Sequence, residues 1–253
     1  MFNLLYRFYE KQLEHGLVPE DLPQHVAVML DGNRRWAKTR GINNPKHGHE
    51  AGAQKIFDFL GWCDEIGIKV VTLYLLSTDN LKNRHPNELN DLLSIIVELA
   101  EEMSTRQQWK LRVMGDRELL PHEVAVRLDS ATQATLKLKK TEVNLAVGYG
   151  GRKEITDAIR AILLKHADQG SSVEQIAELL DPELISQHLY TGGQPDPDLI
   201  IRTSGEQRLS GFLLWQSASS ELYFEEELWP DFRKVDFLRA LRAFEKRHRR
   251  YGA

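Results

Sequence analysis

Short apolar runs alternate with amphipathic helical stretches along this 253-residue chain, and this alternation limits the possible folds more than any other feature. Six short runs are strand candidates: residues 25–30, 70–75, 111–114, 143–147, 199–201 and 222–224, of which 70–75 is the continuous, β-branched one typical of a strand covered on both faces. Helical patterns lie between or after them: residues 48–66, 88–103, a stretch opened by Pro121, 152–165 and 235–247. The alternation predicts an α/β fold with a central, mainly parallel six-stranded sheet flanked by helices.

The chain shows no internal repeat and no linker that would divide it. The longest polar interruption, residues 166–172, is too short to separate two domains, so we expect a single domain over residues 23–253. Residues 1–22 are predicted to be an N-terminal amphipathic helix and its lead-in. Apolar side chains fall near one face of this helix: Phe2, Leu5, Tyr6, Tyr9 and Leu13. Packing on the body or on a partner subunit is favoured over anchoring at a membrane surface.

Charge and cysteine content exclude several classes of protein. With 33 Lys and Arg against 37 Asp and Glu, the net charge is −4, which argues against a nucleic-acid binder. Cys63 is the single cysteine, so neither an internal disulfide nor a Cys/His zinc site is expected. No apolar stretch approaches the roughly 20 residues that cross a bilayer. These features predict a cytoplasmic protein, with peripheral contact to the inner face of the membrane left open.

Polar segments follow four of the predicted strands at the point where each strand ends. These segments are residues 31–35, 77–80, 148–152 and 202–208. In open parallel sheets, ligands bind outside the carboxyl ends of the strands. We therefore expect the four segments to converge on one edge of the sheet.

The side chains in these segments suit a diphosphate. Four arginines (Arg34, Arg35, Arg202 and Arg208) and four hydroxyls (Ser77, Thr78, Ser204 and Ser210) could bind phosphate oxygens. Asp31 is the carboxylate best placed to hold Mg²⁺ against a diphosphate. The alternative is that the arginines pair with surface carboxylates. The sequence has no P-loop, G-x-G-x-x-G, G-x-S-x-G or H-E-x-x-H motif, which disfavours other common chemistries.

Apolar residues flank the same edge and have two possible roles. They are Leu73, Leu75, Leu76, Ile95, Ile96 and Leu99. Such residues are usually core, but a channel for a hydrophobic tail would be built from the same types. Composition does not separate the two roles.

Five sequence blocks resemble the signatures of one enzyme family, in the right order. The blocks are residues 25–37, 73–80, 144–152, 198–216 and 221–232. On them the chain is identified as a member of the cis-prenyltransferase (undecaprenyl diphosphate synthase) family over about residues 23–252. Within that family it is most similar to the actinobacterial short-chain Z-farnesyl diphosphate synthases.

The resemblance implies that isopentenyl diphosphate is condensed with an allylic diphosphate. The expected reaction joins it to geranyl diphosphate and yields the short-chain (Z,E)-farnesyl diphosphate. One alternative is a long-chain synthase making decaprenyl or undecaprenyl diphosphate. Another is a non-catalytic accessory subunit of the same fold, but such subunits lack the aspartate of the first block, which is Asp31 here.

The resemblance also implies roles for individual residues. Asp31 and Asn80 are the catalytic positions, Asp31 through magnesium and Asn80 through proton removal or substrate orientation. Substrate binding is implied for Gly32, Asn33, Arg34, Arg35, Trp36, His49, Ser77, Thr78, Asp79, Arg84, Arg202, Arg208, Leu209 and Ser210. Glu221 corresponds to a second metal carboxylate that reaches across a homodimer, and Arg250 and Gly252 belong to the C-terminal R-x-G motif.

Some positions depart from the family pattern. Arg34 stands where many members have glycine, and Asp79 and Leu81 replace the usual glutamate and tryptophan, which leaves the choice of allylic substrate open. Longer-chain relatives usually carry a small residue where this chain has Leu75, so Leu75 is predicted to limit product length. The alternative is that Leu75 is ordinary core and that other residues set the length.

Overall fold

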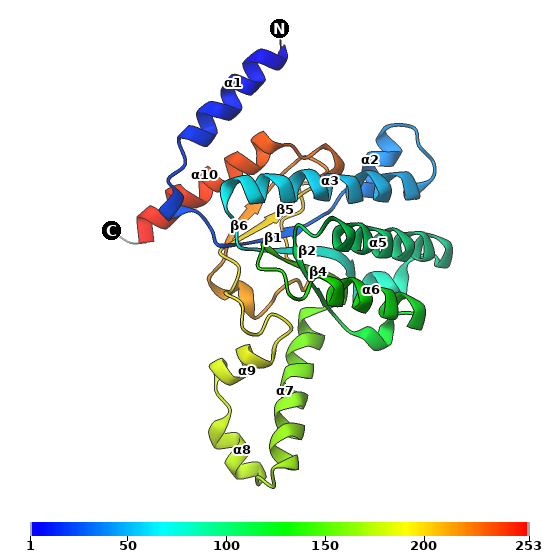
Figure 1. Cartoon of the computed structure of the whole chain (residues 1–253), viewed down its shortest axis with the longest axis vertical. Coiled ribbons are helices and arrows are strands. Elements are labelled where there is room, and N and C mark those ends of the chain that lie inside the picture. The colour runs from blue at the N-terminus through cyan, green and yellow to red at the C-terminus, as the bar shows by residue number, and fades with distance from the viewer. Residues whose placement is uncertain (1, 252–253) are drawn as a thin grey trace.

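A six-stranded, all-parallel sheet forms the centre of the protein in a computed structural model that describes residues 2–251, and the side chains of residues 9–247 (Figure 1). The strands are β1 (His25–Met29), β2 (Val70–Ser77), β3 (Lys110–Met114), β4 (Glu142–Tyr149), β5 (Leu199–Arg202) and β6 (Glu221–Phe224). Their order across the sheet is β3-β4-β2-β1-β5-β6, and every pair is parallel. The predicted α/β fold with six strands is confirmed.

The register of the central strands brings three loops together. Met29, at the end of β1, pairs with Tyr74 of β2 on one side and with Arg202 of β5 on the other. Because the strands run in the same direction, the segments that follow them leave from one edge of the sheet. The convergence expected from the sequence is therefore present for the segments after β1, β2 and β5.

Helices cover the sheet and extend beyond it. The longer helices are α1 (Phe2–His15), α3 (Pro45–Ile66), α5 (Pro86–Arg106), α6 (His122–Thr135), α7 (Gly151–Asp168) and α10 (Lys234–Tyr251). The side chains of β1 alternate between two cores, as in a strand covered on both faces. Val28 packs with residues of α3, α5 and α10, whereas Met29 packs with Phe212 and Tyr149 on the other face.

Four short helices were not predicted from the sequence: α2 (Asn33–Thr39), α4 (Thr78–Asn83), α8 (Val173–Leu179) and α9 (Pro182–His188). Each has six or seven residues, too few to show a helical period. Side-chain caps mark three of them: the Ser77 hydroxyl accepts from the Asn80 amide, Ser172 and Gln175 form a capping box, and the Asp181 carboxylate accepts from the Leu184 amide. Helices α7, α8 and α9 form an arm that projects from the body (Figure 1).

The N-terminal helix α1 is present as predicted and projects from the body opposite the arm (Figure 1). It contacts α10, and Leu13 near its end is buried in the main core. The side chains of Phe2, Leu5 and Tyr6 lie outside the described residues. Among the described helices, none has both the length and the apolar character needed to span a membrane.

Candidate active site

A cavity of about 630 Å³ opens at the carboxyl ends of β1, β2 and β5. Its polar end is lined by Asp31, Gly32, Asn33, Arg34, Arg35, His49, Ser77, Asp79, Asn80, Arg84, Arg202, Glu206, Arg208 and Ser210. Its apolar end is lined by Ile56, Leu75, Leu76, Leu92, Ile95, Ile96, Leu99 and Trp229. The volume lies in the usual range for small-molecule sites. A cavity that is charged at one end and apolar at the other suits an amphiphilic ligand.

Asp31 lies at the polar end, where its backbone and side chain are both fixed. The Thr203 hydroxyl lies 3.0 Å from the Asp31 amide and 2.7 Å from its carbonyl oxygen. The Gly32 amide donates to Oδ1 at 2.8 Å, and Arg202 Nη2 donates to Oδ2 at 2.9 Å. The side chain remains 42% exposed, so the carboxylate still has a free approach from the cavity.

Gly32 makes the turn from β1 into α2, with a φ of 108° that favours glycine. A Cβ atom at this position would lie 2.8 Å from Leu228 Cδ2, so any side chain would clash as well. Asn33 follows, and its side chain lies against the backbone of α3 at Gly52, where a Cβ would fall 2.6 Å from Asn33 Oδ1. These close approaches place the segment 31–35 against the cavity.

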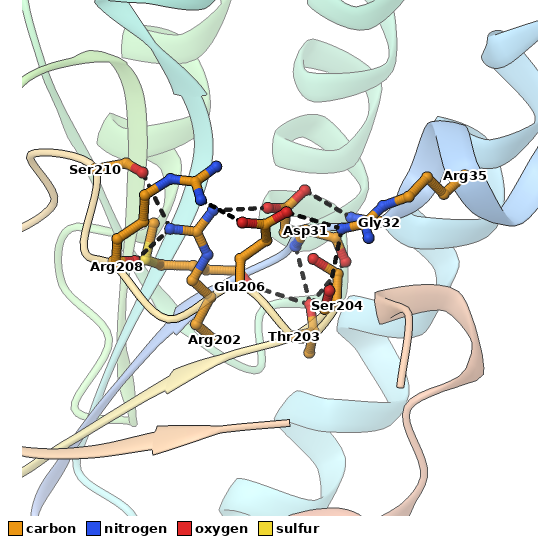
Figure 2. Close-up of polar contacts among 10 residues, drawn as sticks. Asp31, Gly32, Arg35, Arg202, Thr203, Ser204, Glu206, Arg208 and Ser210 are labelled. Atoms are coloured by element: carbon orange, nitrogen blue, oxygen red, sulfur yellow. Dashed lines mark hydrogen bonds and ion pairs between the residues drawn. The ribbon is translucent and has the colours of Figure 1, made fainter. Parts of the chain in front are cut away.

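Arg202, at the end of β5, joins the two sides of the polar end (Figure 2). Besides Asp31, it donates through Nη1 to the Ser210 hydroxyl at 3.0 Å and to the Arg208 carbonyl oxygen. It is only 4% exposed, and the left-handed backbone at Ser210 (φ 48°) turns the hydroxyl toward it. By contrast, the Arg208 side chain is 64% exposed at the cavity, where it pairs with Glu206.

Glu206 is a cavity residue that the sequence analysis did not select. Its carboxylate pairs with Arg208 and lies 3.9 Å from Arg35 Nη2, so it balances charge between two predicted phosphate ligands (Figure 2). Arg35 also donates to the Ser204 carbonyl oxygen at 3.1 Å. The position of Glu206 in the polar segment after β5 was the available signal.

On the side of the cavity away from Arg208, His49 of α3 and Arg84 contact Glu88 of α5, a second residue that the sequence analysis did not select. His49 Nε2 lies 3.3 Å from Glu88 Oε1 and 3.2 Å from Arg84 Nη1, and Arg84 donates to the same carboxylate oxygen. Burial, reinforced by Arg84, lowers the pKa of His49 below its usual value. Burial alone would raise the pKa of Glu88, but His49 and the arginines hold it below the usual range. The group therefore carries an ionised carboxylate against arginine at neutral pH.

The segment after β2 contributes a mixture of polar and apolar side chains. Ser77, Asp79, Asn80 and Leu75 line the cavity. Thr78 does not: its hydroxyl lies against Gly150, where a Cβ would fall 2.8 Å away.

Tyr74, which the sequence analysis missed, also lines the cavity. It stacks on Phe212 at 4.5 Å between ring centroids. Burial raises its pKa to about 12, so it stays protonated at neutral pH.

Two other predicted binding residues lie beside the cavity rather than in its wall. Trp36 donates through Nε1 to Asp231 at 2.9 Å, and the Arg40 guanidinium stacks 4.2 Å from its ring, so Trp36 fixes α2. Leu209 packs into the core beneath Phe212. In this structure both residues shape the site indirectly.

The apolar residues that flank this edge could be either core or the wall of a channel for a hydrophobic tail, and the structure assigns most of them to one of these roles. Leu75, Leu76, Ile95, Ile96 and Leu99 line the cavity, whereas Leu73 is fully buried core. Ile56, Leu92 and Trp229 complete the apolar wall and had not been selected. They lie on α3, on α5 and in the loop after β6. These segments come together only in the folded structure, so the sequence alone did not indicate their residues.

Glu221 does not meet Asp31 within one chain. Glu221 is the first residue of β6, three residues before Phe224, which pairs with Arg202. Because a strand rises roughly 3.3 Å per residue, Glu221 lies away from the edge of the sheet where Asp31 and Arg202 meet. Its carboxylate accepts from Arg247 Nη1 at 2.8 Å. Gly252 and the Arg250 side chain lie outside the described residues. Within the described part of the chain, no group of three or more His, Cys, Asp or Glu side chains could hold a metal ion.

Comparisons with known proteins identify the family. Residues 29–252 match the family model described as "Putative undecaprenyl diphosphate synthase". The (2Z,6E)-farnesyl diphosphate synthase of Mycobacterium tuberculosis (strain ATCC 25618 / H37Rv) is 53% identical over 251 residues, covering 98% of this chain and 95% of the relative. The enzyme of the same name from Thermobifida fusca is 55% identical over 248 residues, covering 98% and 97%.

A solved structure shows the same architecture. Lavandulyl diphosphate synthase from Lavandula x intermedia, in complex with dimethylallyl diphosphate, superposes with a TM-score of 0.82 at 35% identity, covering 89% of this chain and 96% of that one. The chain therefore belongs to the undecaprenyl diphosphate synthase family of cis-prenyltransferases and is a transferase of prenyl groups.

Proposed function

We propose that this enzyme joins isopentenyl diphosphate to geranyl diphosphate and releases (2Z,6E)-farnesyl diphosphate and inorganic diphosphate. The observation that carries the proposal is the single cavity with Asp31 and Arg202 at its charged end and leucine and isoleucine side chains at the other. The names of the bacterial relatives support the short product.

The two diphosphates have separate positions in this proposal. The allylic diphosphate binds at the segment Gly32–Arg35 with His49 and Arg84, and its tail enters the apolar end. The diphosphate of isopentenyl diphosphate binds Arg202, Arg208 and Ser210 on the other side of Asp31. This arrangement places the reactive carbons of the two substrates between the two groups of ligands.

Magnesium fits the donor set at Asp31. A single exposed carboxylate together with diphosphate oxygens is the kind of ligand set that Mg²⁺ accepts, and Asp31 offers that carboxylate at the cavity. When bound there, the ion would neutralise charge that develops on the leaving diphosphate. The Gly32 amide and Arg202 keep the Asp31 carboxylate in one orientation, so little reorganisation is needed during the reaction.

Asn80 orients the condensing unit in this mechanism rather than acting as a base. The allylic C–O bond breaks, a bond forms to the terminal carbon (C4) of isopentenyl diphosphate, and one proton leaves C2, so that the new double bond forms between C2 and C3. A neutral amide is too weak a base for that proton, so the departing diphosphate takes it. The Ser77 hydroxyl caps the helix turn at the Asn80 amide with a distance of 3.0 Å, which holds Asn80 at the cavity.

We also propose that two chains assemble as a homodimer in the cytoplasm. Large apolar side chains on the arm and beside it are exposed: Leu163, Leu164, Val173, Leu179, Leu180 and Leu214. A second copy would cover such a surface. In such a dimer, Glu221 of one chain would act as a metal carboxylate for the site of the other chain. The C-terminal R-x-G residues would approach that same site. Helix α1 is the segment that would make any peripheral membrane contact.

Product analysis tests the proposed reaction directly. The purified protein is incubated with geranyl diphosphate, labelled isopentenyl diphosphate and Mg²⁺, and the dephosphorylated products are separated by chromatography. A C15 product with a cis double bond is expected. Chains of C50 or longer would instead support the long-chain synthase, and the absence of any product would favour the accessory subunit.

A further inference from the structure

Glu88 does not itself line the cavity, but one of its oxygens is shared by three basic side chains that do. Oε1 accepts from Arg84 Nη1, lies 3.3 Å from His49 Nε2, and lies 3.9 Å from Arg34 Nε. The Glu88 side chain is only 16% exposed. A phosphate oxygen bound at this place would have the same neighbours.

Further polar atoms beside Glu88 have no partner within the described residues. His49 Nδ1 and Arg84 Nε are both buried and form no hydrogen bond there. Buried polar atoms without partners are costly, and both belong to side chains that line the cavity, so a ligand that shifts these side chains would gain by pairing the atoms. A single carboxylate therefore satisfies only part of the hydrogen-bonding capacity at this position, whereas a diphosphate, with more oxygens, could satisfy more.

We propose that the Glu88 carboxylate is an internal stand-in for the allylic diphosphate, which must displace it from Arg84, His49 and Arg34 in order to bind. This inference rests on the proposed function, because it uses the same residues as the diphosphate site. In the empty enzyme, Glu88 offsets the cost of holding basic groups together in a partly buried place. It also competes with the substrate, so diphosphate binding is weaker than the basic side chains alone would allow.

The location of Glu88 on α5 connects this exchange to the apolar end. Leu92, Ile96 and Leu99 follow it at spacings of four, eight and eleven residues, which place them on the same face of one helix, and all three line the cavity. The distance from Glu88 to Leu99 along the axis is about 16 Å at 1.5 Å per residue. When Glu88 loses its contacts with Arg84 and His49, the first turn of α5 is no longer held by them. The rest of α5 forms the wall around the prenyl tail.

Pyrophosphate binding tests the competition without any catalytic turnover. Isothermal titration calorimetry with magnesium pyrophosphate is carried out on the full-length wild type, on Glu88→Gln and on the control Glu98→Gln. Glu98 lies on the exposed side of α5, where it contacts Ser94, so the control makes the same charge change on the same helix. We expect Glu88→Gln to lower the Kd at least fivefold and Glu98→Gln to leave it unchanged. A Kd that is unchanged or raised in Glu88→Gln would overturn the proposal, since it would show that Glu88 only positions Arg84 and His49.

A second measurement uses the wild type and so does not depend on the folding of a variant. Hydrogen exchange of residues 87–93 is followed with and without pyrophosphate. Displacement of Glu88 predicts faster exchange in this first part of α5 on binding, while α6 stays unchanged; binding with unaltered exchange would contradict the displacement. If the wild type bound no pyrophosphate at all, the proposed function would fail together with this inference. If it bound but the Glu88 results were negative, the inference alone would fail.

Discussion

Asp31 Oδ2 and Arg202 Nη2 lie 2.9 Å apart, although 171 residues separate them in the chain. The pair exists because β1 and β5 are parallel neighbours whose last residues are in register. Arg202 is nearly buried and also holds the Ser210 hydroxyl, so the proposed magnesium carboxylate and the proposed isopentenyl diphosphate site share one guanidinium. A substitution at either residue should therefore alter the kinetics with both substrates, but to different extents.

Asp31→Ala is expected to reduce kcat at least a hundredfold, about 2.7 kcal/mol in the barrier, because the magnesium carboxylate is lost. Binding of isopentenyl diphosphate should remain nearly intact, since Arg202 keeps its bonds to Ser210 and to the Arg208 carbonyl oxygen. Steady-state kinetics with Mg²⁺ and direct binding of isopentenyl diphosphate measure the two effects. Asp58→Ala, at an exposed position of α3, is the control. A loss of less than tenfold would count against a central role for Asp31.

Arg202→Lys should raise the KM for isopentenyl diphosphate at least tenfold. A lysine retains the charge but cannot present the planar fork that reaches Asp31 and Ser210 at the same time. The KM for geranyl diphosphate should change less, because its proposed ligands are on the other side of Asp31. Arg160→Lys on the exposed side of α7 serves as the matched control. Equal increases in both KM values would argue for a general structural defect instead.

Leu75→Ala is expected to yield products longer than C15. Leu75 lines the cavity at the end of β2, and the smaller side chain removes three carbons from the wall, whereas each condensation adds five carbons to the product. Chromatography of products from wild type, Leu75→Ala and the exposed-site control Leu136→Ala gives the comparison. An unchanged product in Leu75→Ala would mean that other residues, such as Leu76 or those on α5, set the length.

The proposed homodimer should have a mass in solution of twice 29.1 kDa, measured by multi-angle light scattering. Leu164→Glu places a charge on the exposed apolar surface of the arm and should shift the equilibrium toward monomer. Leu136→Glu, exposed beyond the end of α6, should not. A wild-type monomer with full activity would contradict the dimer and the role of Glu221 across it.

Stability should fall as the pH falls below about 6.5, in part because of His25. This side chain is fully buried, with Nε2 2.8 Å from the Thr72 hydroxyl and Nδ1 2.8 Å from the Pro195 carbonyl oxygen, and burial lowers its pKa from 6.5. Between pH 6.5 and that lowered value the unfolded chain binds a proton that the folded chain does not. Stability is therefore lost with falling pH, at up to about 1.4 kcal/mol per unit. Urea denaturation at several pH values should show this slope, and it should be shallower in His25→Gln.

Much of the fold could be predicted because it depends on local patterns. All six strands contain short, mainly apolar runs, and parallel topology requires the segments that follow them to share an edge. Asp31, Asn80, Arg202 and Ser210 were identified in this way and by resemblance, and all four line one cavity. The short helices α2 and α4 were missed because they have only seven and six residues, too few to show a hydrophobic period.

The sequence by itself determined the strand and helix pattern, the chemical character of the segments after the strands, and the family. Only the tertiary structure decided which charges face each other. Glu88 and Glu206 look like ordinary surface glutamates in the sequence, yet each contacts arginines that belong to the predicted phosphate sites. Likewise, Leu76 lines the cavity and Leu73 does not, although both belong to one strand. The physical reason is that pairing across the cavity depends on how α3 and α5 pack against the sheet, and this packing is set by the whole core rather than by any local run of residues.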